Sequence, residues 1–206
     1  MERAEQQELK RYTAEEFFAL PDDGIRRELI DGIIYVKVEA IDDRPLGMAG
    51  ATFEHQTVLG EIWGQLKDFL KGKPCRVLTA PHNIQLNPNF DDTIVQPDIF
   101  VVCDKSKYGG SVYKGAPTLV IEILSPSTAK NDKIIKMEKY RQAGVREYWI
   151  VDPTTQFVDV YLLFGDIYSI RSYSNEETAV PIMVLEGCEI NLVEVFAALD
   201  YLEGTQ

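Results

Sequence analysis

Apolar residues recur with two different spacings along the chain, and together these predict a mixture of helices and strands. From Phe53 to Leu70 they recur every three or four residues, which is typical of a helix with one buried face. Short apolar runs typical of strands cover residues 26–30, 33–38, 76–79, 83–86, 93–102, 119–124, 147–151, 157–163 and 168–173. With further helices expected at 131–143 and 192–199, the pattern predicts an α/β (α+β) fold, a mixed sheet with helices packed on it.

Local signals place several element ends. Thr13-Ala-Glu-Glu16 is a capping-box pattern that predicts a short helix ending before Pro21. Asp31-Gly32 lies between two apolar runs and predicts a tight hairpin. Gly144 follows the helix predicted at 131–143, where a left-handed C-terminal cap is expected. Residues 41–52 and 103–116 are expected to be loops, and residues 125–127 a turn.

The chain has 206 residues, which is suited to one domain with a sizeable core. We expect that domain at 12–200, after a frayed segment at 1–11. No apolar run approaches the ~18 residues of a membrane helix, and the polar N-terminus has no signal-like core. Three cysteines, an odd and sparse set, favour neither a disulfide scaffold nor a zinc site. A reducing cytoplasm is the expected location.

The net charge of −12 disfavours a protein that coats nucleic acid, because phosphate binding relies on Lys and Arg. It does not exclude a nuclease, since a metal ion can supply local positive charge. One dense basic stretch offers either a phosphate-facing stripe or an ordinary solvated helix. Its members are Lys130, Lys133, Lys136, Lys139, Arg141 and Arg146.

Glu122 interrupts the apolar run Leu-Val-Ile-Glu-Ile-Leu. Such a run is typical of a central strand buried on both faces, and a carboxylate there needs a partner to offset the lost hydration. The alternative is an edge strand on which Glu122 faces water. The sequence thus indicates a buried acid with a chemical role.

Asp98 is a second acid beside an apolar strand, in Gln-Pro-Asp-Ile-Phe-Val-Val. Pro97 lacks an N–H and interrupts the sheet ladder just before it, so Pro97-Asp98 could also be a simple turn. Strands joined by a modest loop are often neighbours, about 4.8 Å apart. Asp98 and Glu122 could therefore grip one hard cation such as Mg²⁺.

Lys136 lies on the following predicted helix, between Tyr140 and Ala143 on the helical wheel. That arc could face the sheet, but Ile134 and Met137 define another apolar arc, so the wheel leaves the buried face open. Lys136 either extends its ammonium to the carboxylate pair or points outward into water.

The spacing of these residues resembles a known nuclease signature. Pro97-Asp98, followed 24 residues after Asp98 by Glu122 within Ile-Glu-Ile-Leu, resembles the PD-(D/E)XK pattern, although Leu124 stands where that pattern has lysine. The surrounding sequence resembles the Uma family of restriction-endonuclease-like proteins over roughly residues 12–165. The matching segments are Glu-Leu-Ile-Asp-Gly (28–32), His55-Gln56, Val-Gln-Pro-Asp (95–98), Gly-Ala-Pro-Thr-Leu-Val-Ile-Glu-Ile-Leu-Ser-Pro-Ser-Thr (115–128), Asp132 with Lys136, and 140–153.

The resemblance implies a restriction-endonuclease-like fold and cleavage of nucleic acid, most simply DNA, with Mg²⁺ or Mn²⁺. Asp98, Glu122 and the carbonyl of Ile123 would hold the metal. Lys136 matches the family's displaced lysine and would position water or neutralise charge. Glu28 matches a further acid of the family pattern. It could be an auxiliary ligand of the metal or of water, or simply a surface acid beside Arg26 and Arg27.

Other residues admit two readings. His55 could contact a phosphate, orient a catalytic group or simply make a cap or core hydrogen bond, and His82 is given no role. Tyr148 and Trp149 fit a core or dimer contact better than a base-stacking platform. Two alternatives to a nuclease stay open: a nuclease-like binding or assembly module, such as a homodimer, and hydrolysis of another phosphoester.

Overall fold

Helix α1 and strands β1 and β2 form from the local signals at the start of the chain. In the computed structural model, which describes residues 10–36, 52–89, 93–125 and 131–200, Thr13 caps α1 (Ala14–Phe18) with both hydrogen bonds of a capping box. Asp31 and Gly32 have φ of 51° and 76°, as a tight hairpin turn requires, between β1 (Arg27–Ile30) and β2 (Ile33–Val36). The expected loop at 41–52, the turn at 125–127 and the frayed segment at 1–11 lie largely outside the described residues.

The larger of the two main sheets has the order β12-β11-β10-β9-β6-β3. Its strands are β3 (Arg76–Thr79), β6 (Ile99–Val102), β9 (Leu119–Ile123), β10 (Glu147–Asp152), β11 (Phe157–Phe164) and β12 (Ile167–Ser174). β9 and β10 run parallel and the other neighbours antiparallel. The sheet is therefore mixed, as the sequence predicted, and β9 lies near its centre.

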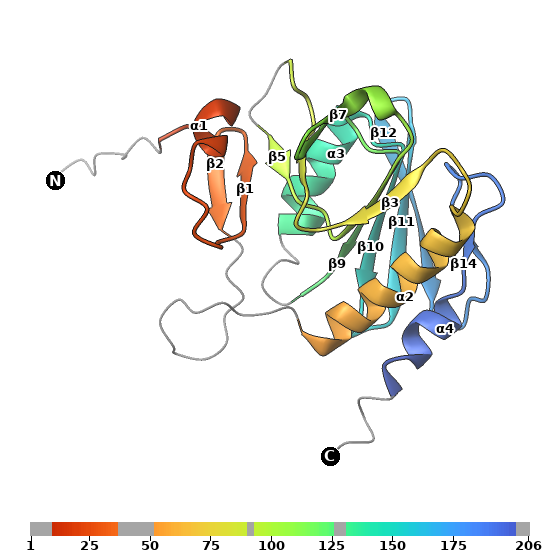
Figure 1. Ribbon diagram of the computed structural model, residues 1–206. Coiled ribbons are helices and arrows are strands. Elements are labelled where there is room, and N and C mark those ends of the chain that lie inside the picture. The colour runs from red at the N-terminus through yellow and green to blue at the C-terminus, as the bar shows by residue number, and fades with distance from the viewer. Residues whose placement is uncertain (1–9, 37–51, 90–92, 126–130, 201–206) are drawn as a thin grey trace, which may run out of the picture.

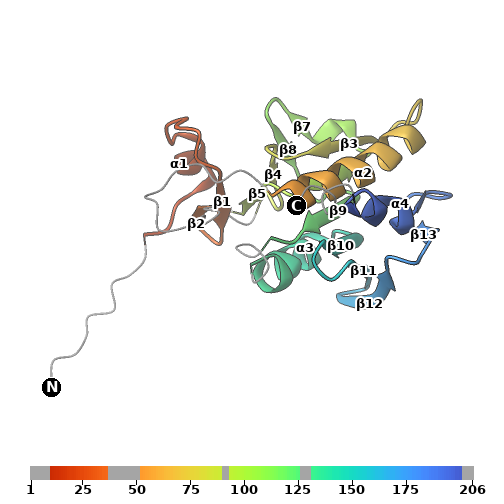
Figure 2. The same cartoon turned by 90° about the horizontal axis from the view of Figure 1, so that it is seen from below.

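Helices cover both faces of this sheet. On one face, α2 (Phe53–Phe69) and α4 (Leu192–Ala197) pack over Ile121 and Trp149 in a core of aliphatic side chains. On the other, α3 (Met137–Ala143) packs over Val120 and Tyr148. Figures 1 and 2 show α2 and α4 together on one side and α3 on the other. Because strand side chains alternate, Glu122 belongs to the α3 face, with Val120 and Leu124.

The second sheet has the order β2-β1-β5-β4-β8-β7, and a two-stranded sheet pairs β13 (Val180–Pro181) with β14 (Glu189–Ile190). The strands not yet introduced are β4 (Asn83–Gln85), β5 (Ile94–Val95), β7 (Tyr108–Gly109) and β8 (Val112–Lys114). β7, β8 and a 3₁₀ turn at Lys105–Lys107 occupy residues 103–116, where the sequence predicted only a loop. Those strands are too short to give a periodic signal.

The single strand predicted at 93–102 is divided in two. β5 joins the second sheet, β6 joins the larger one, and Gln96-Pro97-Asp98 connects them. Pro97 has no N–H with which to continue the ladder, so the chain changes sheet there. Asp98 consequently lies at the junction of the two sheets.

The helix predicted at 131–143 begins differently from the prediction. Residues Asn131–Lys136 form a π-helix, which continues as α3 and ends at Gly144 with φ of 83°. The left-handed cap is thus confirmed. A π segment followed by an α-helix explains why a simple helical wheel could not select the buried face.

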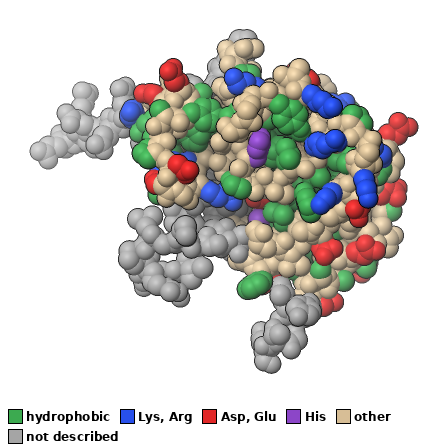
Figure 3. Space-filling view, viewed as in Figure 1, with side chains coloured by type: hydrophobic (Ala, Val, Ile, Leu, Met, Phe, Trp, Pro, Cys, Tyr) green, Lys and Arg blue, Asp and Glu red, His purple; other side chains and the backbone are tan. Residues whose placement is uncertain are grey.

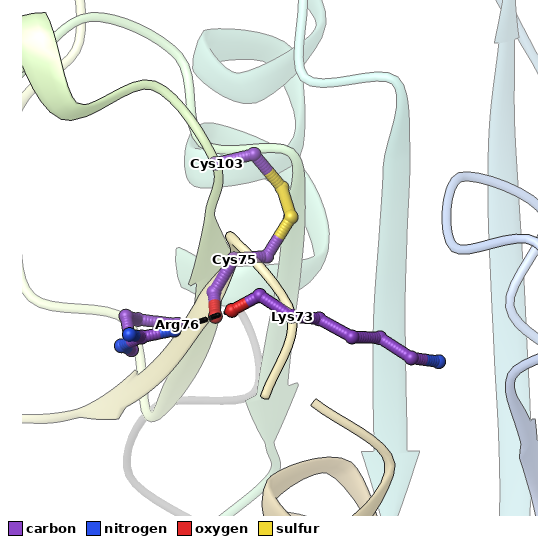
Figure 4. The surroundings of a disulfide bond; sticks show 4 residues. All are labelled: Lys73, Cys75, Arg76 and Cys103. Carbon is purple, nitrogen blue, oxygen red and sulfur yellow. Dashed lines mark hydrogen bonds between the residues drawn. A yellow bond between two sulfur atoms is a disulfide. The ribbon is translucent and has the colours of Figure 1, made fainter. Parts of the chain in front are cut away.

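Cys75 and Cys103 form a disulfide, contrary to the expectation from the sequence (Figure 4). They flank β3 and β6, in which Arg76 pairs with Val102, so the two cysteines face each other with Cα atoms 4.1 Å apart. Their separation of 28 residues gave no hint of this pairing, which depends on the strand register. Cys188 is buried and free. Within the described residues, no helix combines the length and apolar character needed to span a membrane.

Candidate active site

The carboxylates of Asp98 and Glu122 are buried next to each other at the junction of the two sheets. Glu122 is fully buried in β9, between β6 and β10, so the edge-strand alternative is excluded. Oδ2 of Asp98 accepts from the main-chain N–H of Ile123 at 3.0 Å, and Oε2 of Glu122 accepts from the N–H of Asp98 at 3.4 Å. The backbone of Asp98 therefore positions the side chain of Glu122, and the backbone of Ile123, the residue after Glu122, positions the side chain of Asp98.

Lys136 approaches these acids from the segment that leads into α3. Its side chain is fully buried, and its Nζ forms ion pairs with Oε1 of Glu122 and, at 3.1 Å, with Oε1 of Glu28. Ile134 is exposed, whereas Tyr140 is buried, so the helix packs on the sheet by the arc that contains Lys136. The alternative of a lysine extending into water is wrong.

Glu28 reaches the same place from the second sheet. It is 4% exposed in β1, and its Oε1 also accepts from the main-chain N–H of Gln96 at 2.7 Å. The reading of Glu28 as a surface acid is therefore wrong. Gln96 lies in the connection between β5 and β6, so Glu28 fixes the segment that carries Asp98.

His55 contacts Asp98 directly. Its Nε2 lies 3.2 Å from Oδ2 of Asp98, and its ring is buried at the start of α2. An ionised carboxylate only accepts hydrogen bonds, so Nε2 carries the proton in this contact. The helix cap is provided by Thr52, whose Oγ1 accepts from the N–H of His55. Of the roles considered for His55, orientation of an acid fits these contacts.

Tyr140 is a member of the cluster that sequence reasoning missed. Its hydroxyl donates to Oε1 of Glu122 at 2.7 Å, and the residue is fully buried in α3. Burial, with the negative charge of Glu122 adding to it, raises the pKa of Tyr140 well above its ordinary value, so the hydroxyl stays a donor. Its position four residues after Lys136, one helical turn on, was the available signal.

We expect Tyr140→Phe to lower the free energy of unfolding by about 1.5–3 kcal/mol, because a buried carboxylate loses a hydrogen bond. Urea titration followed by circular dichroism measures this. Tyr161→Phe is the matched control, since Tyr161 belongs to the same aromatic cluster and its hydroxyl has no hydrogen bond within the described residues. Equal losses in the two variants would contradict a specific role for the Tyr140 hydroxyl.

Negative charge exceeds positive charge in this cluster. Glu28, Asp98 and Glu122 supply three carboxylates, and Lys136 supplies one ammonium. Gathering like charges in a buried place is costly, so a bound cation would stabilise the arrangement.

The donor set fits a hard cation held by few protein ligands. Its donors are carboxylate oxygens, which Mg²⁺ and Mn²⁺ prefer. Across the ranges that the structure describes, no three His, Cys, Asp or Glu side chains are grouped to hold a metal. A cation here would therefore take Asp98 and Glu122 and complete its shell with main-chain oxygen and water, as Mg²⁺ commonly does.

The basic stretch around α3, for which a phosphate-facing stripe and a solvated helix were both open, is partly paired with acids. Lys136 is buried among the acids, Lys139 pairs with Asp31 at 2.5 Å, and Arg141 pairs with Glu138 at 2.6 Å. The side chains of Lys130 and Lys133 lie outside the described residues. The described part of the stripe therefore offers less free positive charge than its composition suggested.

The remaining candidates belong to the core. Trp149 is fully buried and its Nε1 donates to Oε1 of Glu147 at 2.7 Å, while Tyr148 packs against Tyr140. Neither is available for stacking on a base. His82 packs near Phe100, and partial burial lowers its pKa.

Comparison with known proteins identifies a structural neighbour and a relative. The solved structure of a chain from Anabaena variabilis, described as a putative nuclease belonging to DUF820, superposes with a TM-score of 0.70 at 20% identity. The superposition covers 91% of this chain and 98% of that one, and it shows a shared fold. An uncharacterized protein from Synechocystis sp. is 27% identical over 126 residues, which are 61% of this chain and 65% of that protein.

A family model described as "Putative restriction endonuclease", Uma2, matches residues 14–193. The match includes both sheets and each residue of the buried cluster. The chain therefore belongs to the Uma2 family.

Proposed function

We propose that this protein is a divalent-metal-dependent endonuclease that hydrolyses phosphodiester bonds of nucleic acid, with DNA as its first expected substrate. The observation that carries the proposal is the buried cluster in which the carboxylates of Asp98, Glu122 and Glu28 gather around the ammonium of Lys136. Membership of a family described as restriction endonucleases supports the same reaction class. On this proposal, residues 12–200 form the catalytic domain.

Asp98, Glu122 and the main-chain carbonyl of Ile123 are the groups that would hold Mg²⁺ or Mn²⁺. Such an ion supplies an acidified water molecule and stabilises charge on a scissile phosphate. His55 holds Oδ2 of Asp98 in place, and the N–H of Ile123 restrains the same oxygen. These contacts limit the rotation of the Asp98 carboxylate and so preorganise the site.

Lys136 would supply the positive charge that the transition state needs beside the carboxylates. Its ammonium already contacts Glu122 and Glu28, and it can offset negative charge that develops on a phosphate. Leu124, at the position where the common signature has lysine, is 8% exposed and packs in the α3 core. The helix thus brings an ammonium to Glu122 from another part of the chain.

The test is cleavage by the purified protein with Mg²⁺ or Mn²⁺. Supercoiled plasmid, linear duplex, single-stranded DNA and RNA are each incubated with the wild type, the Asp98→Asn variant, and the wild type with EDTA. We expect cleavage of at least one DNA form by the wild type and none in the two controls, because both remove the bound cation. Failure to cut any of these substrates with either metal, or equal cleavage by Asp98→Asn, would refute the proposal.

Cleavage of both strands of a duplex would need two such sites, so we further propose that the active form is a homodimer. This part of the proposal rests on the chemistry of the substrate. Light scattering at the protein concentration of the cleavage assay measures the mass of the active species.

A further inference from the structure

The end of α2 and the start of β3 form a basic surface segment. Residues 67–76 contain four cations, Lys67, Lys71, Lys73 and Arg76, and one acid, Asp68, in a chain of net charge −12. Sequence reasoning passed over this segment because the stretch around α3 is richer in Lys and Arg.

These four cations differ from those of α3 in their partners. Among the described residues, none of them forms an ion pair with an acid, whereas Lys136, Lys139 and Arg141 all do. Lys67 lies over the ring of Trp63, with Nζ 4.3 Å from its centroid, and Lys73 lies over Phe69. The ammonium groups of Lys67 and Lys73 therefore lie over aromatic rings, and none of the four cations is paired with a described carboxylate.

The segment surrounds a pocket of about 380 Å³. Three cations, Lys67, Lys71 and Arg76, and one acid, Asp68, line it beside Trp63 and Cys75. One wall is held by the Cys75–Cys103 disulfide and by Arg76, whose Nη1 donates to the carbonyls of Lys73 and Cys75 at 2.7 and 2.8 Å (Figure 4). Figure 3 shows Lys and Arg side chains gathered over this part of the molecule.

We propose that this pocket binds the phosphate backbone of the nucleic acid at a point remote from the cleavage site. The inference rests on the proposed function for its choice of ligand. Cations without acid partners attract phosphate, and each phosphate contact releases counterions. Such contacts fix the position of a nucleic acid without reading its sequence.

The position of the pocket relative to the acids suits an extended polyanion. His55, at one end of α2, contacts Asp98, and Lys67 follows twelve residues later on the same helix. A helical rise of ~1.5 Å per residue places the two about 18 Å apart. Phosphates recur every ~3.4 Å along each strand, so one duplex could reach both places within about five base pairs.

The test is the salt dependence of DNA binding, measured by fluorescence anisotropy in EDTA with a labelled duplex of mixed sequence, about 30 bp long. The wild type is compared with two double variants that change the net charge equally. Lys67→Glu/Lys71→Glu alters the pocket. Arg146→Glu/Arg171→Glu removes two exposed arginines that lie outside the pocket lining.

We expect Lys67→Glu/Lys71→Glu to weaken binding at least about tenfold near 0.1 M salt and to lower the salt slope by about two, one for each lost contact. The arginine control should keep the wild-type slope. Equal effects of the two double variants would overturn the proposal, because the loss would then reflect net charge alone. Absence of any duplex binding by the wild type at low salt would overturn it too.

Mn²⁺ calorimetry on the same proteins separates this inference from the proposed function. The pocket variants should bind Mn²⁺ as the wild type does, because neither lysine touches Asp98 or Glu122. A wild type that takes up Mn²⁺ and cuts DNA, but whose duplex affinity is unaffected by Lys67→Glu/Lys71→Glu, would refute the pocket and leave the nuclease standing.

Discussion

Glu122→Gln is expected to reduce metal-dependent cleavage by about a thousandfold, or about 4 kcal/mol of transition-state stabilisation. The amide keeps the shape of the side chain but loses the charge that would hold a cation. Mn²⁺ affinity, measured by calorimetry, should fall at least about a hundredfold. That is the largest loss typically seen when a residue that only supports a metal ligand is replaced, and Glu122 would be a ligand itself. The fold should survive, because Lys136 keeps its contact with Glu28.

Glu147→Gln is the matched control for this variant. Glu147 is also a fully buried glutamate, in β10, where it accepts from Trp149 Nε1 and from the N–H of Val184, away from the acids of the site. We expect unchanged Mn²⁺ binding and cleavage in Glu147→Gln. If Glu122→Gln kept wild-type cleavage, or if both variants lost it equally, Glu122 would have no specific role.

Lys136→Met is expected to have the largest effect on stability. It removes the ammonium and leaves the carboxylates of Glu28 and Glu122 buried without it, a change that typically costs about 3–5 kcal/mol. Urea unfolding in EDTA measures the loss. Cleavage by the folded fraction should also fall, since the ammonium that pairs with Glu122 is lost.

Added Mn²⁺ should restore part of the stability of Lys136→Met, because the ion replaces the missing positive charge. At a hundred times its Kd, a ligand specific to the folded state contributes about 2.7 kcal/mol. Lys139→Met is the control on the same helix: its partner Asp31 is half exposed, so the expected loss is below about 1 kcal/mol. A loss in Lys136→Met no larger than that control would show that the buried ion pairs are not needed for folding.

The two central acids could be predicted because burial and charge conflict within a short stretch of sequence. Glu122 interrupts an apolar run and Asp98 follows a proline at a strand start, and both signals are local. Lys136 was a candidate only through family resemblance and an ambiguous helical wheel. The π-helix at Asn131–Lys136 accounts for that ambiguity, since its turn differs from the 100° per residue that the wheel assumes.

Contacts between distant segments could not be predicted. The hydroxyl of Tyr140 and the ring of His55 reach the acids only through the packing of α3 and α2 on opposite faces of the sheet. Cys75 and Cys103 meet through the register of β3 and β6. The ion pairs that neutralise the α3 stripe likewise depend on Asp31 arriving from the first hairpin. Sequence periodicity carries no information about such pairings.

The passage of Gln96-Pro97-Asp98 from one sheet to the other has a consequence for how the cluster is assembled. Glu28 comes from the first hairpin, Asp98 from the crossing itself, and Lys136 from beyond the central strand. Each of these arrives by a contact between segments that are distant in the sequence, and closing the chain between them has an entropic cost. The buried cluster is thus a property of the completed domain, and we expect a polypeptide that ends before Lys136 to lack the ammonium that holds Glu28 and Glu122 together.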